Sequence, residues 1–146
     1  MIHKNVILIC VFIFSFLSCN SQGIKKNKVI IKYVDYTIET PFAITPDYFE
    51  TAFKEELDSI IIINKDIEEK IVKFIENAKY IDTSTTIDVR QKLLFSTKNK
   101  IIELFSDGES KMLIGNKPIA YNFEFQNLIN SMIYKRQSSQ AKPSNK

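Results

Sequence analysis

This chain of 146 residues has an apolar run near its N-terminus, Val6 to Leu17. We expect the segment that contains this run to stay outside the folded domain, which the rest of the chain would form. A secretory signal peptide has a short basic segment followed by an apolar stretch of about 7–15 residues. Here Lys4 supplies the basic residue before the apolar run. The run is shorter than the roughly 20 apolar residues that span a bilayer. A membrane anchor and a buried N-terminal strand are the alternatives. We expect residues 1–18 to be removed on export.

The residues after this run resemble a known processing site. Leu17-Ser18-Cys19 is similar to the lipobox of bacterial lipoproteins, although Phe16 stands where that family usually has Leu. The resemblance implies cleavage between Ser18 and Cys19 and acylation of the Cys19 thiol, so that the membrane is a partner through Cys19. Two or three acyl chains hold a protein on a bilayer where one does not. Asn20, by analogy with enteric lipoproteins, implies the outer membrane, facing the periplasm.

Charge is separated along the remaining chain. Residues 19–28 form a polar segment with three lysines, and residues 135–146 carry four basic residues and no acid. Residues 29–134 carry 12 Lys and Arg against 17 Asp and Glu, a net charge of −5. We expect a flexible tether, one globular domain and a disordered basic tail. A nucleic-acid-binding domain needs a basic surface, whereas this domain has a net negative charge, so we expect no nucleic-acid partner.

The apolar pattern of residues 29–134 predicts an α+β domain. Helices are expected after Thr45-Pro46, over 64–78 with Asn64 as cap, and after Asn122. Strands are expected at 29–38, 57–63, 89–96, 101–105, 111–114 and 119–121. Asp107-Gly108 predicts a hairpin turn. This order favours a mixed, mainly antiparallel sheet of about five to six strands, with helices packed on one face.

The chain lacks the side chains of most familiar catalytic sites. His3 is the only histidine, and Cys10 and Cys19 are the only cysteines. Processing as above leaves no imidazole base, no free thiol and no cysteine-rich zinc site. Three glycines are too few for a glycine-rich phosphate loop. We therefore expect no catalytic residue, no metal, no cofactor and no enzymatic activity.

Carboxylates are the remaining catalytic candidates. Asp35 and Glu103 interrupt apolar strand patterns. Asp107 and Glu109 flank Gly108, where a calcium site would need more oxygen ligands than this loop offers. A carboxylate with a raised pKa would serve as a base, and two carboxylates about 5–10 Å apart would support a small hydrolase. A strand end, a solvent-facing strand position and a turn explain the same residues, and we favour these structural roles.

Four aromatic residues form a candidate binding patch. Tyr33, Tyr36, Phe42 and Tyr48 are close in sequence. Together on the surface they would offer a site for a partner. Aromatic strand residues usually fill a core, and we favour that role here.

In its Ile- and Lys-rich composition and its size, the globular part is similar to many small bacterial envelope lipoproteins. We expect a lipid-anchored, non-catalytic binding or interaction module whose partner is an envelope protein. A small carboxylate-dependent hydrolase and an inhibitor or immunity-like protein are the alternatives. The sequence indicates neither the ligand nor the oligomeric state.

Overall fold

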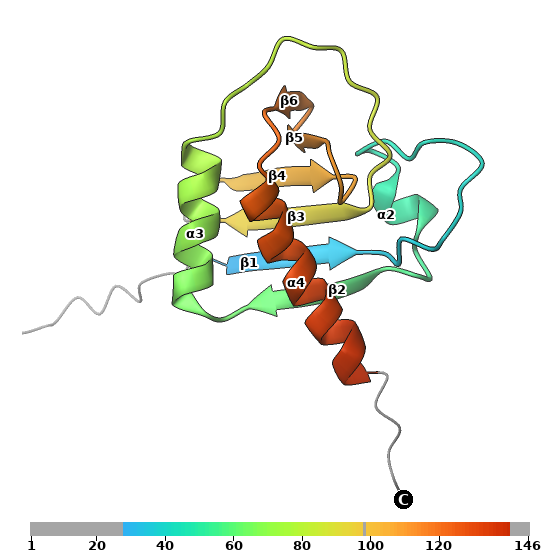
Figure 1. Cartoon of the computed structure of the whole chain (residues 1–146), viewed down its shortest axis with the longest axis horizontal. Coiled ribbons are helices and arrows are strands. Elements are labelled where there is room, and N and C mark those ends of the chain that lie inside the picture. Colours follow the sequence, from blue (N-terminus) through green and yellow to red (C-terminus); the bar gives the residue numbers. More distant parts are fainter. Residues whose placement is uncertain (1–27, 98, 141–146) are drawn as a thin grey trace, which may run out of the picture.

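The structure is a computed structural model that describes residues 28–97 and 99–140. Its centre is a six-stranded sheet with the order β2-β1-β3-β4-β5-β6, and each neighbouring pair is antiparallel (Figure 1). The strands are β1 (Lys28–Tyr33), β2 (Asp58–Ile62), β3 (Gln91–Ser96), β4 (Ile101–Ser106), β5 (Met112–Ile114) and β6 (Lys117–Ile119). The predicted α+β class with an antiparallel sheet is confirmed.

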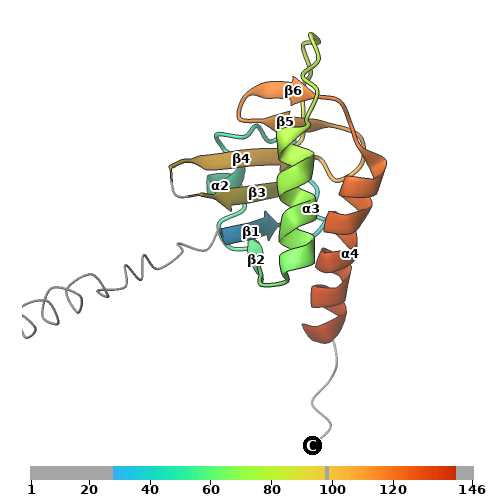
Figure 2. The same ribbon diagram turned by 90° about the vertical axis from the view of Figure 1, so that its left-hand side faces the viewer.

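Two long helices cover one face of this sheet. They are α3 (Lys65–Glu76) and α4 (Phe123–Gln140), and Figure 2 shows both on the same side. The short α2 (Phe49–Ala52) lies on the other side, so the expectation of all helices on one face is wrong for α2. Phe49 of α2 and Phe53, which directly follows the helix, explain this placement, because they pack against the sheet face that α3 and α4 leave free.

Successive side chains of each strand point to opposite faces of the sheet, and each face carries its own hydrophobic core. In β1, Val29 and Ile31 are buried toward α3 and α4, whereas Ile30 and Lys32 point to the opposite face. The first core cluster consists of Val29, Ile31, Tyr33, Ile71, Leu93, Phe95, Leu104, Met112, Ile119, Phe125, Ile129 and Ile133. The second, around α2, consists of Val34, Ile44, Phe49, Phe53, Ile87, Val89, Phe105 and Leu113.

Both predicted asparagine caps are confirmed. The Asn64 side chain accepts a hydrogen bond from the backbone N–H of Ile67 at 3.1 Å. The Asn122 side chain accepts one from the backbone N–H of Phe125 at 2.8 Å. Each bond satisfies a donor that the first turn of a helix leaves without a partner, and so fixes where the helix begins.

Several predicted boundaries are wrong. β1 begins at Lys28, inside the expected tether, and ends at Tyr33 rather than at residue 38. α4 continues to Gln140, so residues 135–140, expected to belong to a disordered tail, are helical. Lys, Arg and Gln are good helix formers and no Gly or Pro interrupts them, so the helix propagates past its last core residue. The predicted signal peptide, Ser18, Cys19, the tether through residue 27 and residues 141–146 lie outside the described residues.

Candidate functional site

The four aromatic residues of the predicted patch do not share one surface. Tyr33 is buried in the first core cluster, and its hydroxyl donates to Asp58 Oδ2 at 2.8 Å. Burial and this hydrogen bond raise the pKa of Tyr33 well above its ordinary value. Phe42 and Tyr48 are 70% and 67% exposed. Only these last two are available to a partner.

Tyr36 belongs to a polar network that fastens α4 to the sheet. Its hydroxyl contacts the side chains of Gln91 and Asn130, and Gln126 donates to Gln91 Oε1 at 2.8 Å. Ser106 Oγ donates to Gln126 Oε1 at 2.6 Å. Among the described residues every buried side-chain nitrogen or oxygen has a partner. The network is therefore complete without a ligand, and we assign it a structural role.

Two carboxylates meet at one lysine on the α2 side of the sheet. Glu50 and Glu103 each lie 2.8 Å from Lys92 Nζ, so their oxygens are within twice that distance of each other. A small pocket of about 440 Å³ opens beside them. A hydrolase of this type needs one carboxyl with a raised pKa. Hydrogen bonds from the Lys32 and Lys92 ammonium groups instead hold the pKa of Glu50 below its ordinary value, which favours an ion-pair network over acid catalysis.

The other candidate acids have turn roles. Asp35 accepts from the backbone N–H and the hydroxyl of Thr37 at 2.9 and 2.8 Å, and these bonds lower the pKa of Asp35. A lowered pKa is the opposite of what the base hypothesis requires. Asp107 accepts from three backbone N–H groups in the turn that Gly108 completes. Glu109 is exposed beside it.

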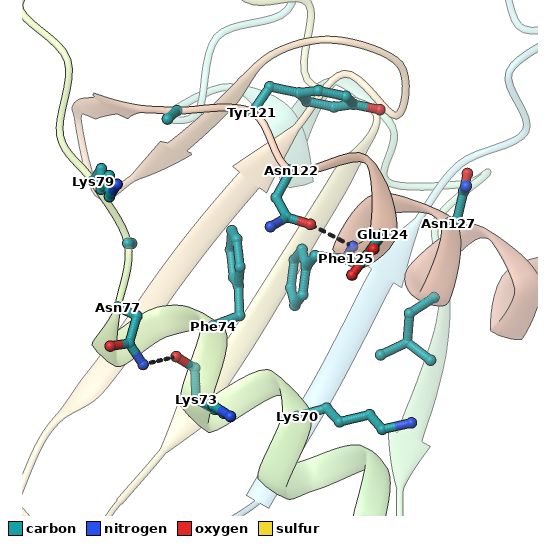
Figure 3. A pocket seen from close by; sticks show the side chains of 13 residues that line it. Lys70, Lys73, Phe74, Asn77, Lys79, Tyr121, Asn122, Glu124, Phe125 and Asn127 are labelled. Carbon is teal, nitrogen blue, oxygen red and sulfur yellow. Dashed lines mark hydrogen bonds between the residues drawn. The ribbon is translucent and has the colours of Figure 1, made fainter.

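An open cavity lies between α3 and α4 (Figure 3). It has a volume of about 940 Å³ and opens on the helical side of the sheet. We call it the α3–α4 cleft. Its lining residues are Lys70, Lys73, Phe74, Asn77, Ala78, Lys79, Ala120, Tyr121, Asn122, Glu124, Phe125, Asn127 and Leu128.

The floor of the α3–α4 cleft is aromatic and fixed. Phe74 of α3 and Phe125 of α4 stack face to face, with ring centroids 3.8 Å apart and planes 12° from parallel. At one end the Ala120 N–H donates to the Lys79 carbonyl at 2.8 Å, which ties the segment after α3 to the segment that leads into α4. These two contacts join α3 and α4 at the floor and at one end of the cleft.

The rim of the α3–α4 cleft is predominantly basic. Lys70, Lys73 and Lys79 line it on the α3 side, and Glu124 is the acid on the α4 side. Figure 3 shows Lys70 and Lys73 rising from the same face of α3. This excess of positive charge stands out on a fold whose residues 29–134 carry a net charge of −5. The side chains of Asn77, Asn122 and Asn127 add amide donors and acceptors.

The sequence interpretation missed this site, although a signal for it was present. Residues 70, 73, 74, 77 and 78 recur at the spacing of one helix face. The spacing also predicts exposed ion pairs of Lys70 with Asp66 and of Lys73 with Glu69. In the part of the chain that the structure describes, the ion pairs involve Lys32, Arg90 and Lys92 instead.

The described residues contain no group of three His, Cys, Asp or Glu side chains placed to hold a metal ion. Within residues 28–97 and 99–140, no helix has the length and apolarity needed to cross a bilayer. A comparison of the chain with protein-family models, with curated proteins and with solved structures gave no significant match.

Proposed function

We propose that this protein is a lipid-anchored binding module of the cell envelope, that it has no catalytic activity, and that it binds its ligand in the α3–α4 cleft. The observation that carries the binding site is an aromatic floor beneath a lysine-rich rim. Ligand sites in proteins are typically apolar cavities with a few convergent polar groups. The cleft, at about 940 Å³, falls within the size range of such sites.

The chemistry of the α3–α4 cleft favours a ligand that is both apolar and anionic. A flat or aliphatic group of the ligand would lie along Phe74 and Phe125, where it loses contact with water. A carboxylate or phosphate would lie at the rim near Lys70 and Lys73. Ammonium groups at a solvent-exposed rim contribute on the order of 1 kcal/mol each, so burial of the apolar part would supply most of the affinity.

The anchor is supported by the sequence alone, through Leu17-Ser18-Cys19. It is tested by mass spectrometry of the mature N-terminus from cultures grown with and without globomycin, which blocks the lipoprotein signal peptidase. We expect an acylated Cys19 as the first residue without the drug and an intact N-terminus with it. A mature protein that still begins at Met1 in untreated cells would refute the anchor.

The α3–α4 cleft is tested with anilinonaphthalene sulfonate, a small aromatic anion. The protein is produced without residues 1–18 and with Cys19→Ser, and binding is followed residue by residue through amide chemical shifts. We expect shifts in residues 73–79 and 120–128. Lys73→Glu replaces attraction by repulsion and should weaken binding about tenfold. Lys54→Glu, an exposed lysine beyond α2, makes the same charge change elsewhere and should have little effect.

Two results would refute the proposed binding site. One is a set of amide shifts that avoids the α3–α4 cleft. The other is equal weakening by Lys73→Glu and Lys54→Glu, because that would mean that the anion responds to the overall charge of the protein and not to the lysines of the rim.

A further inference from the structure

The sheet face opposite α3 and α4 is only partly covered. Figure 1 shows α2 at the end of the sheet where β1 finishes, and Lys32 reaches Glu50 of α2 there. Two residues back along β1, Ile30 lies opposite Ile61 of β2 and opposite Leu94 of β3. These three side chains form an apolar row across the sheet, and none of them belongs to the core cluster around α2.

A second row of side chains lies on the same face, two residues closer to the start of β1. Lys28 is opposite Ser96, and Ser96 is opposite Ile101 of β4. Ile63 directly follows the last residue of β2, next to the pair formed by Ile62 and Val29. We call Ile30, Ile61, Ile63, Leu94 and Ile101 the open patch.

Three isoleucines of the open patch are unusually exposed, while Ile30 and Leu94 are half-buried. Ile61, Ile63 and Ile101 are 55%, 81% and 66% exposed. Isoleucine is among the residues that proteins bury most often. Single exposed apolar residues need no explanation, but a contiguous group indicates a surface that another molecule covers. The nearest acid in these rows, Glu103, is neutralised by Lys92 at 2.8 Å.

The proposed lipid anchor is close in sequence to the open patch. Lys28 lies within these rows, and Cys19 precedes it by nine residues. A segment of this length extends at most about 30 Å, so the proposed acyl chains lie within about that distance of this end of the sheet. Lys28 adds positive charge beside the exposed isoleucines, and Lys25 and Lys26 precede it in the chain. Apolar side chains flanked by lysines suit a bilayer with anionic headgroups, which attract each nearby lysine by about 1 kcal/mol.

We propose that the open patch lies against the headgroups and the upper acyl region of an anionic bilayer when Cys19 is acylated. This inference rests on the lipid anchor of the proposed function. It adds an orientation, because α3 and α4 are on the opposite face of the sheet (Figure 2), so the α3–α4 cleft stays open to the periplasm.

The absence of tryptophan from the chain allows a direct test. Ile63→Trp and Ile101→Trp each place one indole in the open patch. Phe42→Trp is the matched control: Phe42 is 70% exposed and lies in the segment between β1 and α2, which Figure 1 shows at the other end of the sheet. The full chain is expressed, purified from membranes in its processed form, and reconstituted into vesicles of phosphatidylcholine and phosphatidylglycerol. Circular dichroism first checks that each variant is folded.

We expect blue-shifted emission from the Ile63→Trp and Ile101→Trp indoles, and strong quenching when the phospholipids are brominated. The Phe42→Trp indole should emit as in water and resist this quencher. If the protein floats with the vesicles but all three indoles respond alike, the orientation is refuted and the anchor stands. If the protein is not acylated and does not float, the anchor itself fails, and the inference with it.

A protein partner on the open patch gives a different result. The Ile63→Trp indole would then be shielded from a soluble quencher in native membranes but exposed in vesicles of pure lipid. That outcome would overturn the lipid assignment.

Discussion

Replacing Gly108 by alanine should destabilise the protein far more than the same change at Gly115. Both glycines have positive φ angles, 88° at Gly108 and 55° at Gly115. An alanine in this region of backbone conformation is strained by about 1–2 kcal/mol. The surroundings of the two glycines differ. A Cβ at Gly108 would lie 2.6 Å from Cζ of Tyr36 and would also overlap its hydroxyl, whereas a Cβ at Gly115 would meet nothing within 4 Å.

The overlap at Gly108 displaces a side chain on which a buried network depends. The Tyr36 hydroxyl contacts Gln91 and donates to Asn130 Oδ1 at 3.2 Å. Moving it takes the Tyr36 hydroxyl away from both partners, at about 1–3 kcal/mol, whereas Asn130 Oδ1 still accepts from Gln91 and Gln126. We expect Gly108→Ala to lower the free energy of unfolding by roughly 3–5 kcal/mol, the strain and the lost bonds combined. Gly115→Ala should lower it by the strain alone, about 1–2 kcal/mol.

Urea unfolding followed by far-UV circular dichroism measures both values. Tyr36→Ala supplies the decisive control, since removing the ring removes the overlap. In that background Gly108→Ala should lower stability by no more than Gly115→Ala does in the wild-type protein. Equal effects of the two glycine substitutions, or an unchanged effect of Gly108→Ala without the Tyr36 ring, would refute the reasoning.

Three further substitutions test other parts of the fold. Gln126→Ala removes a fully buried side chain that bonds to Ser106. It should lower the unfolding free energy in urea by about 2–4 kcal/mol. Burial opposes ionisation of Asp107, but hydrogen bonds from the backbone N–H groups of residues 109–111 prevail and lower its pKa. A lowered pKa stabilises the fold above about pH 4 and loses this effect as the pH falls through the lowered value. Asp107→Asn should therefore be less stable than wild type at pH 7, and the two melting curves should converge toward about pH 2. Asn64→Ala removes the cap bond to Ile67. It should lower stability by about 1 kcal/mol in thermal melts.

Local signals in the sequence predicted local structure well. Asn64 and Asn122 identified two helix starts because a cap needs only the first turn of its own helix. Asp107-Gly108 identified a turn because the Asp107 carboxylate and the positive φ of Gly108 act within a few residues. Such features depend on neighbours in the chain, so the sequence displays them directly.

Features that depend on packing were harder to predict. We expected the last strand at 119–121, but β6 is Lys117–Ile119 and includes Pro118. Proline is tolerated there because β6 is at the edge of the sheet, a position that only the full strand order reveals. The α3–α4 cleft is a further case, because Phe74 and Phe125 are far apart in sequence and meet only when both helices pack on the sheet.

The alternation in β1 explains why the two proposed surfaces do not compete. Val29 and Ile31 hold α3 and α4 on one face, while Ile30 and Lys28 point to the other. The same strand therefore supports the α3–α4 cleft on one side and contributes to the open patch on the other. A strand with apolar residues on both faces suggests an interior position, and β1 has one, between β2 and β3. On its second face α2 reaches Lys32 but not the part around Ile30, and a membrane contact beside the tether would cover that part.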